Sequence, residues 1–139
     1  MGIKYIFQLR MKLSPLRSHK KSYNFNDTPT DICDCNQGVE NTRHFLFDCL
    51  PFAIHRVILA VKITEILERN NIINGDLANN HDLYLYGHPL FNTSDNKRIL
   101  LATISYIEAL KCFPLNKRNN LSHPPFHTMY HLVSLMKYT

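Results

Sequence analysis

Apolar side chains recur at helical spacing near the start of the chain and predict a first helix with one apolar face. The residues on that face are Ile3, Ile6, Phe7 and Leu13. Ser14 followed by Pro15 is typical of a helix start, because serine caps the first turn and proline fits its backbone angle. A second helix is therefore expected over residues 15–23.

Two longer helices are predicted in the second half of the chain. Residues 52–69 form the longest stretch with a helical apolar period, and residues 96–113 form another after a cap at Ser94 or Asp95. The apolar positions of the two stretches are Ile54, Ile58, Val61, Ile66 and Leu67, and Ile99, Leu100, Ala102, Thr103, Ile107 and Leu110. We expect the two helices to pack together. Residues 83–86 fit either a short strand or one helical turn.

The composition agrees with a mainly α fold with little or no sheet. The chain has 139 residues, 45% of them hydrophobic, which suits one small folded domain. No apolar run approaches the roughly 18 residues that a membrane span needs, and the start lacks the pattern of a secretory signal. We expect an intracellular protein, nuclear or cytoplasmic, without a membrane partner.

Three of the four cysteines and one histidine lie close together in the sequence. They follow the pattern C-x-C-x8-H-x4-C, formed by Cys33, Cys35, His44 and Cys49. Three thiols and one imidazole are the ligand set of a closed tetrahedral structural zinc site. Because four ligands leave no open coordination position, the expected Zn²⁺ is structural and not catalytic.

The backbone that carries these ligands is expected to form a short hairpin followed by a short helix. Gly38 ends the polar turn after the first two thiols, because glycine is free to adopt positive φ. Asn41 then caps the helix, and Pro51 ends it. Ideal helical geometry separates His44 from Cys49 by roughly 140°. Cys49 is therefore expected in an unwound last turn, facing His44.

Two other interpretations of the cysteines remain. Free cysteine often behaves as a buried apolar group, in which case His44 would be an ordinary surface residue. Disulfide bonds are a third use. However, Cys33 and Cys35 are poorly placed to bridge each other, and no secretory signal indicates an oxidising compartment.

Basic residues are concentrated near the ends of the chain. Residues 1–26 contain six of them and no acid, whereas residues 27–110 contain all eleven acids. A clustered basic segment is typical of a protein that contacts nucleic-acid phosphates, although a solvated helix face gives the same pattern. The residues that we predict for this contact are Arg10, Lys12, Arg17, Lys20 and Lys21. Tyr23 and Phe25 are expected either to stack on unpaired bases or, more in keeping with aromatic residues, to pack in the core.

These patterns divide the chain into four segments. Residues 1–30 form a basic helical segment, 31–51 a CCHC zinc knuckle, 52–113 a helical hairpin-like region and 114–139 a tail. Cys112 is expected to be buried or inert. In the tail, His123, His127 and His131 recur every four residues, but Pro124 separates the first from any helix that the other two share.

Over about residues 5–113 the chain resembles the region after the polymerase in jockey-like non-LTR (LINE-type) retrotransposon reverse transcriptases. The matching stretches are residues 13–19, 23–29, 33–49, 86–88, 94–97 and 104–107. The resemblance implies that Cys33, Cys35, His44 and Cys49 correspond to the zinc-knuckle ligands of that family. The first pair is one residue closer than the commonest pattern, and the polymerase domain with its paired catalytic aspartates is absent from the sequence.

The acids of this chain are scattered singly, whereas a polymerase or two-metal nuclease needs clustered carboxylates. We therefore expect no catalytic residues and no enzyme activity of its own, although the family that it resembles is RNA-directed DNA polymerase. The leading interpretation is a nucleic-acid-binding zinc-knuckle module that contacts RNA or single-stranded or nicked DNA. The alternatives are a structural zinc module that docks a protein, such as the polymerase domain of the parent element, or a transposon remnant with no function.

Overall fold

The computed structural model describes residues 2–24, 27–73 and 75–110, and its regular elements are helices and helical turns. In chain order they are α1 (Gly2–Arg10), α2 (Arg17–Ser22), η1 (His44–Asp48), η2 (Leu50–Phe52), α3 (Ala53–Arg69), α4 (Gly75–Ala78), α5 (His81–Tyr86) and α6 (Thr93–Leu110). The described ranges contain no strand, only an isolated antiparallel bridge between Ile32 and Val39. The prediction of a mainly α fold is confirmed.

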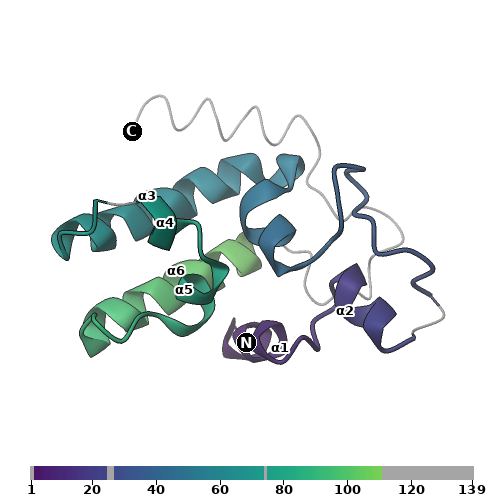
Figure 1. Ribbon diagram of the computed structural model, residues 1–139, viewed down its shortest axis with the longest axis horizontal. Helices are drawn as coiled ribbons and strands as arrows, with labels where there is room; N and C mark the ends of the chain where they lie inside the picture. The colour runs from purple at the N-terminus through teal and green to yellow at the C-terminus, as the bar shows by residue number, and fades with distance from the viewer. Residues whose placement is uncertain (1, 25–26, 74, 111–139) are drawn as a thin grey trace.

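The two longest helices, α3 and α6, lie side by side and run in opposite directions (Figure 1). The end of α3 meets the start of α6, where the Asn70 side-chain amide donates a hydrogen bond to Asp95 Oδ2 at 3.0 Å. Figure 1 shows α1 and α5 against α6, and the segment that leads from α2 to α3 at the other end of the pair. The predicted packing of the two long helices is confirmed.

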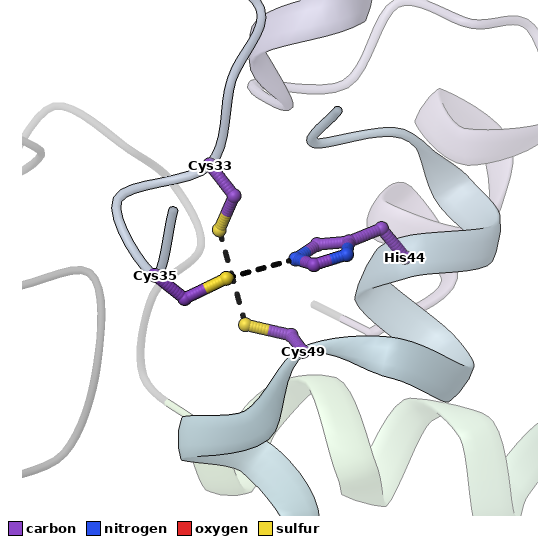
Figure 2. A group of neighbouring side chains, drawn as sticks. All are labelled: Cys33, Cys35, His44 and Cys49. Carbon is purple, nitrogen blue, oxygen red and sulfur yellow. Dashed lines mark hydrogen bonds between the residues drawn. The ribbon is translucent and has the colours of Figure 1, made fainter. Parts of the chain in front are cut away.

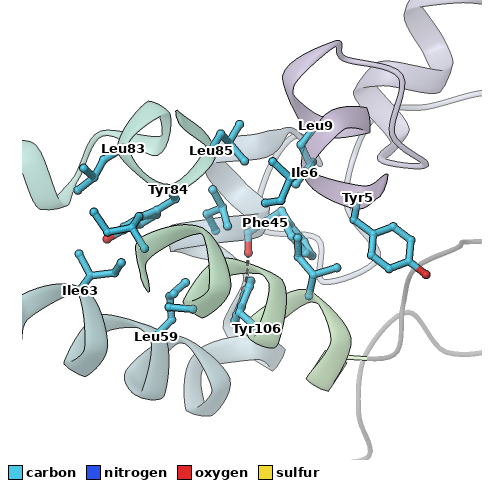
Figure 3. Packing of buried hydrophobic residues seen from close by; sticks show 14 of the residues in the cluster. Tyr5, Ile6, Leu9, Phe45, Leu59, Ile63, Leu83, Tyr84, Leu85 and Tyr106 are labelled. Carbon is cyan, nitrogen blue, oxygen red and sulfur yellow. Dashed lines mark hydrogen bonds between the residues drawn. The ribbon is translucent and has the colours of Figure 1, made fainter. Parts of the chain in front are cut away.

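One hydrophobic cluster connects all of these parts. It contains residues from α1, from the cysteine-rich segment and from α3, α5 and α6 (Figure 3). Phe45, next to His44, packs edge to face on the Tyr106 ring of α6 with 5.4 Å between the ring centroids. The Tyr106 hydroxyl donates a hydrogen bond to the Phe45 carbonyl oxygen at 2.5 Å. The cysteine-rich segment is therefore seated directly on the helical core.

The predicted apolar face of the first helix is wrong in its details. α1 buries Tyr5 and Leu9 together with Ile6, whereas Ile3 and Phe7 are 78% and 58% exposed. The predicted apolar residues and the buried ones both have helical spacing. The apolar period of the sequence therefore did not decide which side of α1 would face α6. The helix ends at Arg10 because Lys12 adopts a left-handed φ of 56°, and Leu13 consequently lies beyond the helix and exposed.

The apolar face of α3 also differs from the prediction. Leu59 and Ile63 are buried along with Ile54, Ile66 and Leu67, whereas the predicted Ile58 and Val61 are exposed. α3 carries apolar residues around most of its circumference, and the position of α6 selects the buried side.

The remaining elements refine the predicted boundaries. Residues 83–86 belong to helix α5 and not to a strand. The N-terminal cap of α6 comes from the Asn92 side chain, which accepts a hydrogen bond from the Asp95 N–H at 2.7 Å, so the helix begins before the predicted cap at Ser94 or Asp95. The predicted end of this helix at residue 113, Cys112, Phe25 and the tail all lie outside the described residues. Among the described helices, none has the length and apolar character to cross a membrane.

Candidate metal centre

The four predicted ligands come together at one point. Their side-chain ligand atoms, the sulfurs of Cys33, Cys35 and Cys49 and a ring nitrogen of His44, all lie within 4.8 Å of one another (Figure 2). The Cys33 and Cys49 sulfurs are 3.8 Å apart, and Cys35 Sγ is 3.2 Å from His44 Nε2. A tetrahedron with metal–sulfur bonds of about 2.3 Å has edges of about 3.8 Å. The donor set therefore has the composition and nearly the size of a tetrahedral zinc site.

A tight turn presents the first two thiols. The Cys33 N–H donates to the Gly38 carbonyl oxygen at 2.8 Å, and the Asn36 N–H donates to the Cys33 carbonyl oxygen at 2.9 Å. Asn36 adopts a left-handed φ of 60°, which asparagine tolerates better than most residues. Together with the Ile32–Val39 bridge, these bonds turn the chain so that Cys33 and Cys35 both face the ligand cluster.

A π turn presents the other two ligands. Asn41 caps this turn as predicted, with its side-chain oxygen accepting the His44 N–H at 2.8 Å. The Cys49 N–H then donates to the His44 carbonyl oxygen at 2.8 Å, across five residues in place of the usual four. The wider turn returns Cys49 to the side of His44, with Cys49 itself in extended backbone. Pro51 does not end this helix; it lies in η2, which leads directly into α3.

The thiols of the cluster are largely buried. Cys33 and Cys49 are 2% and 1% exposed. The neighbouring Cys33 thiol and burial raise the pKa of Cys49 above its usual range, and burial raises the pKa of Cys35. A thiol binds a metal as the thiolate, so the raised pKa values mean that deprotonation costs free energy. A divalent cation among the thiolates would offset that cost. The three cysteines that the structure describes are free, and the 3.8 Å between the Cys33 and Cys49 sulfurs far exceeds the roughly 2.05 Å of an S–S bond.

The basic residues of α2 face acids that flank the ligand turn. Lys20 Nζ lies 2.7 Å from Asp27 Oδ2, and Lys21 Nζ lies 3.8 Å from Asp31 Oδ1. Arg17 forms an ion pair with Asp34. These contacts bind α2 to residues 27–40, a stretch that we call the acidic loop. The positive charge of α2 is therefore largely matched within the protein.

Arg17 contacts two acids of the acidic loop. Its side chain is 17% exposed, its Nε lies 3.7 Å from Glu40 Oε2, and its backbone N–H donates to Glu40 Oε1 at 3.0 Å. The contacts place Arg17 between two acids of the acidic loop, Asp34 and Glu40, next to the metal ligands Cys33 and Cys35. Its position is that of a residue which fastens α2 to the metal centre.

The other two predicted phosphate contacts lie elsewhere. Arg10 donates from Nε to the Leu85 carbonyl oxygen at 2.6 Å and stacks over the Tyr86 ring, 4.7 Å from its centroid. Lys12 is exposed in the turn between α1 and α2. Arg10 therefore contacts α5, whereas Lys12 lies close enough to α2 that burial and its charge together lower the pKa of His19. Tyr23 is exposed, as a stacking residue requires, and not part of the core.

Some residues that hold the centre were not found from the sequence. Tyr106 holds the backbone of η1 from α6, and Arg56 of α3 donates to the carbonyl oxygen of the ligand Cys49. The sequence indicates these roles only weakly, because a tyrosine or an arginine on a predicted helix is compatible with many functions. His55, which the sequence left as a poor fifth ligand, lies outside the four-residue cluster.

No protein-family model, curated protein or solved structure matches the chain in the comparisons made. The resemblance to retrotransposon reverse transcriptases therefore remains a prediction, and the geometry of the Cys33, Cys35, His44 and Cys49 cluster is what supports a metal site in this protein.

Proposed function

We propose that the protein is a non-catalytic helical module with a structural Zn²⁺ site, and that it binds single-stranded nucleic acid. The convergence of Cys33, Cys35, His44 and Cys49 within 4.8 Å is the observation that carries the zinc assignment. Zinc suits these ligands because thiolate and imidazole are its preferred donors, and four of them complete its coordination.

The zinc ion would join two parts of the chain. Cys33 and Cys35 belong to the turn beside α2, whereas His44 and Cys49 belong to η1 on the helical core. A metal ion bound by both pairs would fix α2 relative to α3 and α6. Its role in this proposal is therefore to position surfaces and not to perform chemistry.

The binding of nucleic acid is supported by charge and by the resemblance. The chain has a formal net charge of +5, and the family that it resembles acts on RNA and DNA. RNA, single-stranded DNA and nicked DNA are all compatible with this chemistry, because each offers exposed phosphates and unpaired bases.

Two measurements test the proposal. Elemental analysis of the purified protein should find one equivalent of zinc, which a Cys49→Ser variant should lose. A fluorescein-labelled single-stranded oligonucleotide should bind the zinc-loaded protein with an affinity that falls as salt rises, because phosphate contacts release counterions. Zinc without any such binding would leave only the structural part of the proposal.

A second candidate function is protein docking, and the surface of α1 favours it. Ile3 and Phe7 are both well exposed on one side of this helix, as an apolar partner would require. The polymerase domain of a parent element is the partner that the resemblance implies. Ile3→Ser combined with Phe7→Ser should abolish capture of such a domain and leave oligonucleotide binding unchanged.

A further inference from the structure

A groove of about 380 Å³ lies on the side of η1 that faces α3 and α5. Its apolar part is formed by the buried side chains of Leu46, Leu59 and Ile63. Phe47 and Tyr84 add two aromatic rings, with centroids 5.1 Å apart. The volume falls in the range of about 300–1,000 Å³ that is usual for small-ligand sites.

Two arginines and one acid supply the charge of this groove. Arg43 and Arg56 line it together with Asp48, whose Oδ2 lies 4.0 Å from Arg43 Nε. The Arg43 guanidinium also lies over the Phe47 ring, 5.4 Å from the ring centroid, and donates to the Asn79 carbonyl oxygen at 3.2 Å. The lining therefore combines an excess of positive charge with a stacked planar guanidinium.

Arg56 lies at the boundary between the groove and the metal centre. Its Nη1 donates to the carbonyl oxygen of Cys49. A guanidinium has several further N–H donors in a planar fork that matches phosphate geometry. Arg43 and Asp48 immediately precede the ligands His44 and Cys49 in the chain. The metal ligands therefore position the charged residues of the groove.

This arrangement differs from that of α2. There each basic side chain meets a carboxylate of the acidic loop, whereas the groove is lined by two guanidiniums and one acid, and the acid pairs with Arg43. The groove also places two aromatic rings beside its charge. Unpaired nucleotides present a flat base and a phosphate a few ångströms apart, and proteins bind them by stacking and by cationic contacts together.

We propose that the groove defined by Arg43, Phe47, Arg56 and Tyr84 binds an unpaired nucleotide of a single strand, with the base against the Arg43–Phe47 stack and a phosphate at Arg56. This inference rests on the proposed function and locates its main contact on the groove and not on α2. Zinc removal should abolish the contact, because Arg43 and Asp48 are placed by the backbone of η1.

The test compares two fluorescein-labelled probes, an oligothymidylate and an abasic strand of the same length, by fluorescence anisotropy. Arg43→Gln with Arg56→Gln should weaken the binding of both probes about tenfold or more. It should also reduce the slope of log affinity against log salt by about 0.7, the value for the one phosphate of a single strand that Arg56 contacts. Phe47→Leu should weaken oligothymidylate binding about tenfold and leave the abasic strand unaffected.

The matched control is Lys62→Gln with Lys97→Gln, which removes the same charge from exposed positions on α3 and α6. It should change either affinity less than about twofold. Zinc content and helical circular dichroism should be unchanged in all variants, and Arg43→Gln alone serves if the double variant loses zinc.

The outcomes separate the two proposals. Wild-type protein that binds neither probe would overturn the proposed nucleic-acid function and this inference with it. Wild-type protein that binds both probes, with groove variants that bind equally well, would overturn only the inference. A Phe47→Leu variant that weakens both probes equally would exclude stacking and thereby overturn the assignment of a base to the groove.

Discussion

Residues 27–49 and the α3–α6 pair are neighbours in the fold but are built in different ways. The first region contains a tight turn, one isolated bridge and a single π turn. The second consists of two long helices whose facing side chains are almost completely buried, with Ile99 and Ile107 at 0% exposure. Ion pairs to α2 and the packing of Phe45 on α6 hold the first region, which also carries the candidate metal site, whereas apolar burial alone holds the second.

The difference shows how a short segment without regular structure acquires one conformation. Residues 27–49 bury four apolar side chains, those of Cys33, Phe45, Leu46 and Cys49, and we expect cross-links and ion pairs to add to the ordering of this segment. Forces of this kind respond to chelators, acid and salt. Apolar packing responds mainly to changes of volume. Four predictions follow this contrast between the two regions.

The largest effect is expected from loss of a metal ligand. Cys49→Ser should abolish zinc binding, and structural zinc contributes on the order of 10 kcal/mol to the folding of small metal-dependent motifs. Limited proteolysis should then cut within residues 27–49, whereas the helical circular dichroism of α3 and α6 should largely persist. Cys112→Ser is the control and should keep the zinc. Resistance to proteolysis after zinc loss would contradict this account.

A cavity in the helical core should destabilise the α3–α6 pair and not residues 27–49. Ile107→Ala removes a fully buried side chain from α6 and should lower the free energy of unfolding by about 3 kcal/mol, measured by urea denaturation. Zinc stoichiometry of the folded protein should not change. Leu101→Ala, at an exposed position of the same helix, should cost less than about 0.5 kcal/mol. Equal costs for the two variants would show that α6 is not packed as described.

Acid should weaken the attachment of α2 through a buried histidine. His19 Nδ1 lies 2.7 Å from the Ser14 hydroxyl, and burial together with the nearby Lys12 charge lowers the pKa of His19 to about 4. The unfolded chain, with a pKa near 6.5, therefore binds the proton first as pH falls. Stability that is fully present above about pH 6.5 is lost progressively down to about pH 4, by about 2 kcal/mol at about pH 5.

The measurement for His19 is the urea midpoint at about pH 7 and about pH 5, compared with His19→Gln. Acid also protonates the metal ligands in both proteins, so the difference between their pH dependences isolates His19. Identical pH dependences in the two proteins would mean that His19 is not buried in its neutral form.

The smallest of the four effects concerns the contact between the regions. Tyr106→Phe removes the hydroxyl that donates to the Phe45 carbonyl oxygen and leaves that buried oxygen without this partner. The expected cost is about 1–2 kcal/mol, because a buried acceptor loses its hydrogen bond while the ring packing remains. Zinc affinity should fall slightly, since His44 follows the backbone of η1. An unchanged midpoint and zinc affinity would show that the two regions are held together without this bond.

Much of the local structure was predictable from the sequence. The spacing of Cys33, Cys35, His44 and Cys49 indicated a metal site, and the long apolar periods indicated both ends of α3 and the start of α6 to within a few residues. These signals are local, since ligand type and helical period depend on residues close together in the chain. The π turn was harder to predict from the sequence, because the five-residue interval from His44 to Cys49 conflicts with ordinary helical geometry.

The sequence by itself determined the helical class, the set of ligand residues and the excess of positive charge. Only the tertiary structure decided which apolar side of α1 and α3 is buried, because both helices are apolar around much of their surface and the position of α6 makes the choice. It also decided how the charges are used. Arg17 and Lys20 form ion pairs with the acidic loop because the turn that carries Cys33 and Cys35 folds back on α2. The hydrophobic pattern of the sequence does not predict these pairs. Charge on a chain can be counted from its sequence, but its availability to a partner depends on which opposite charges the fold places beside it.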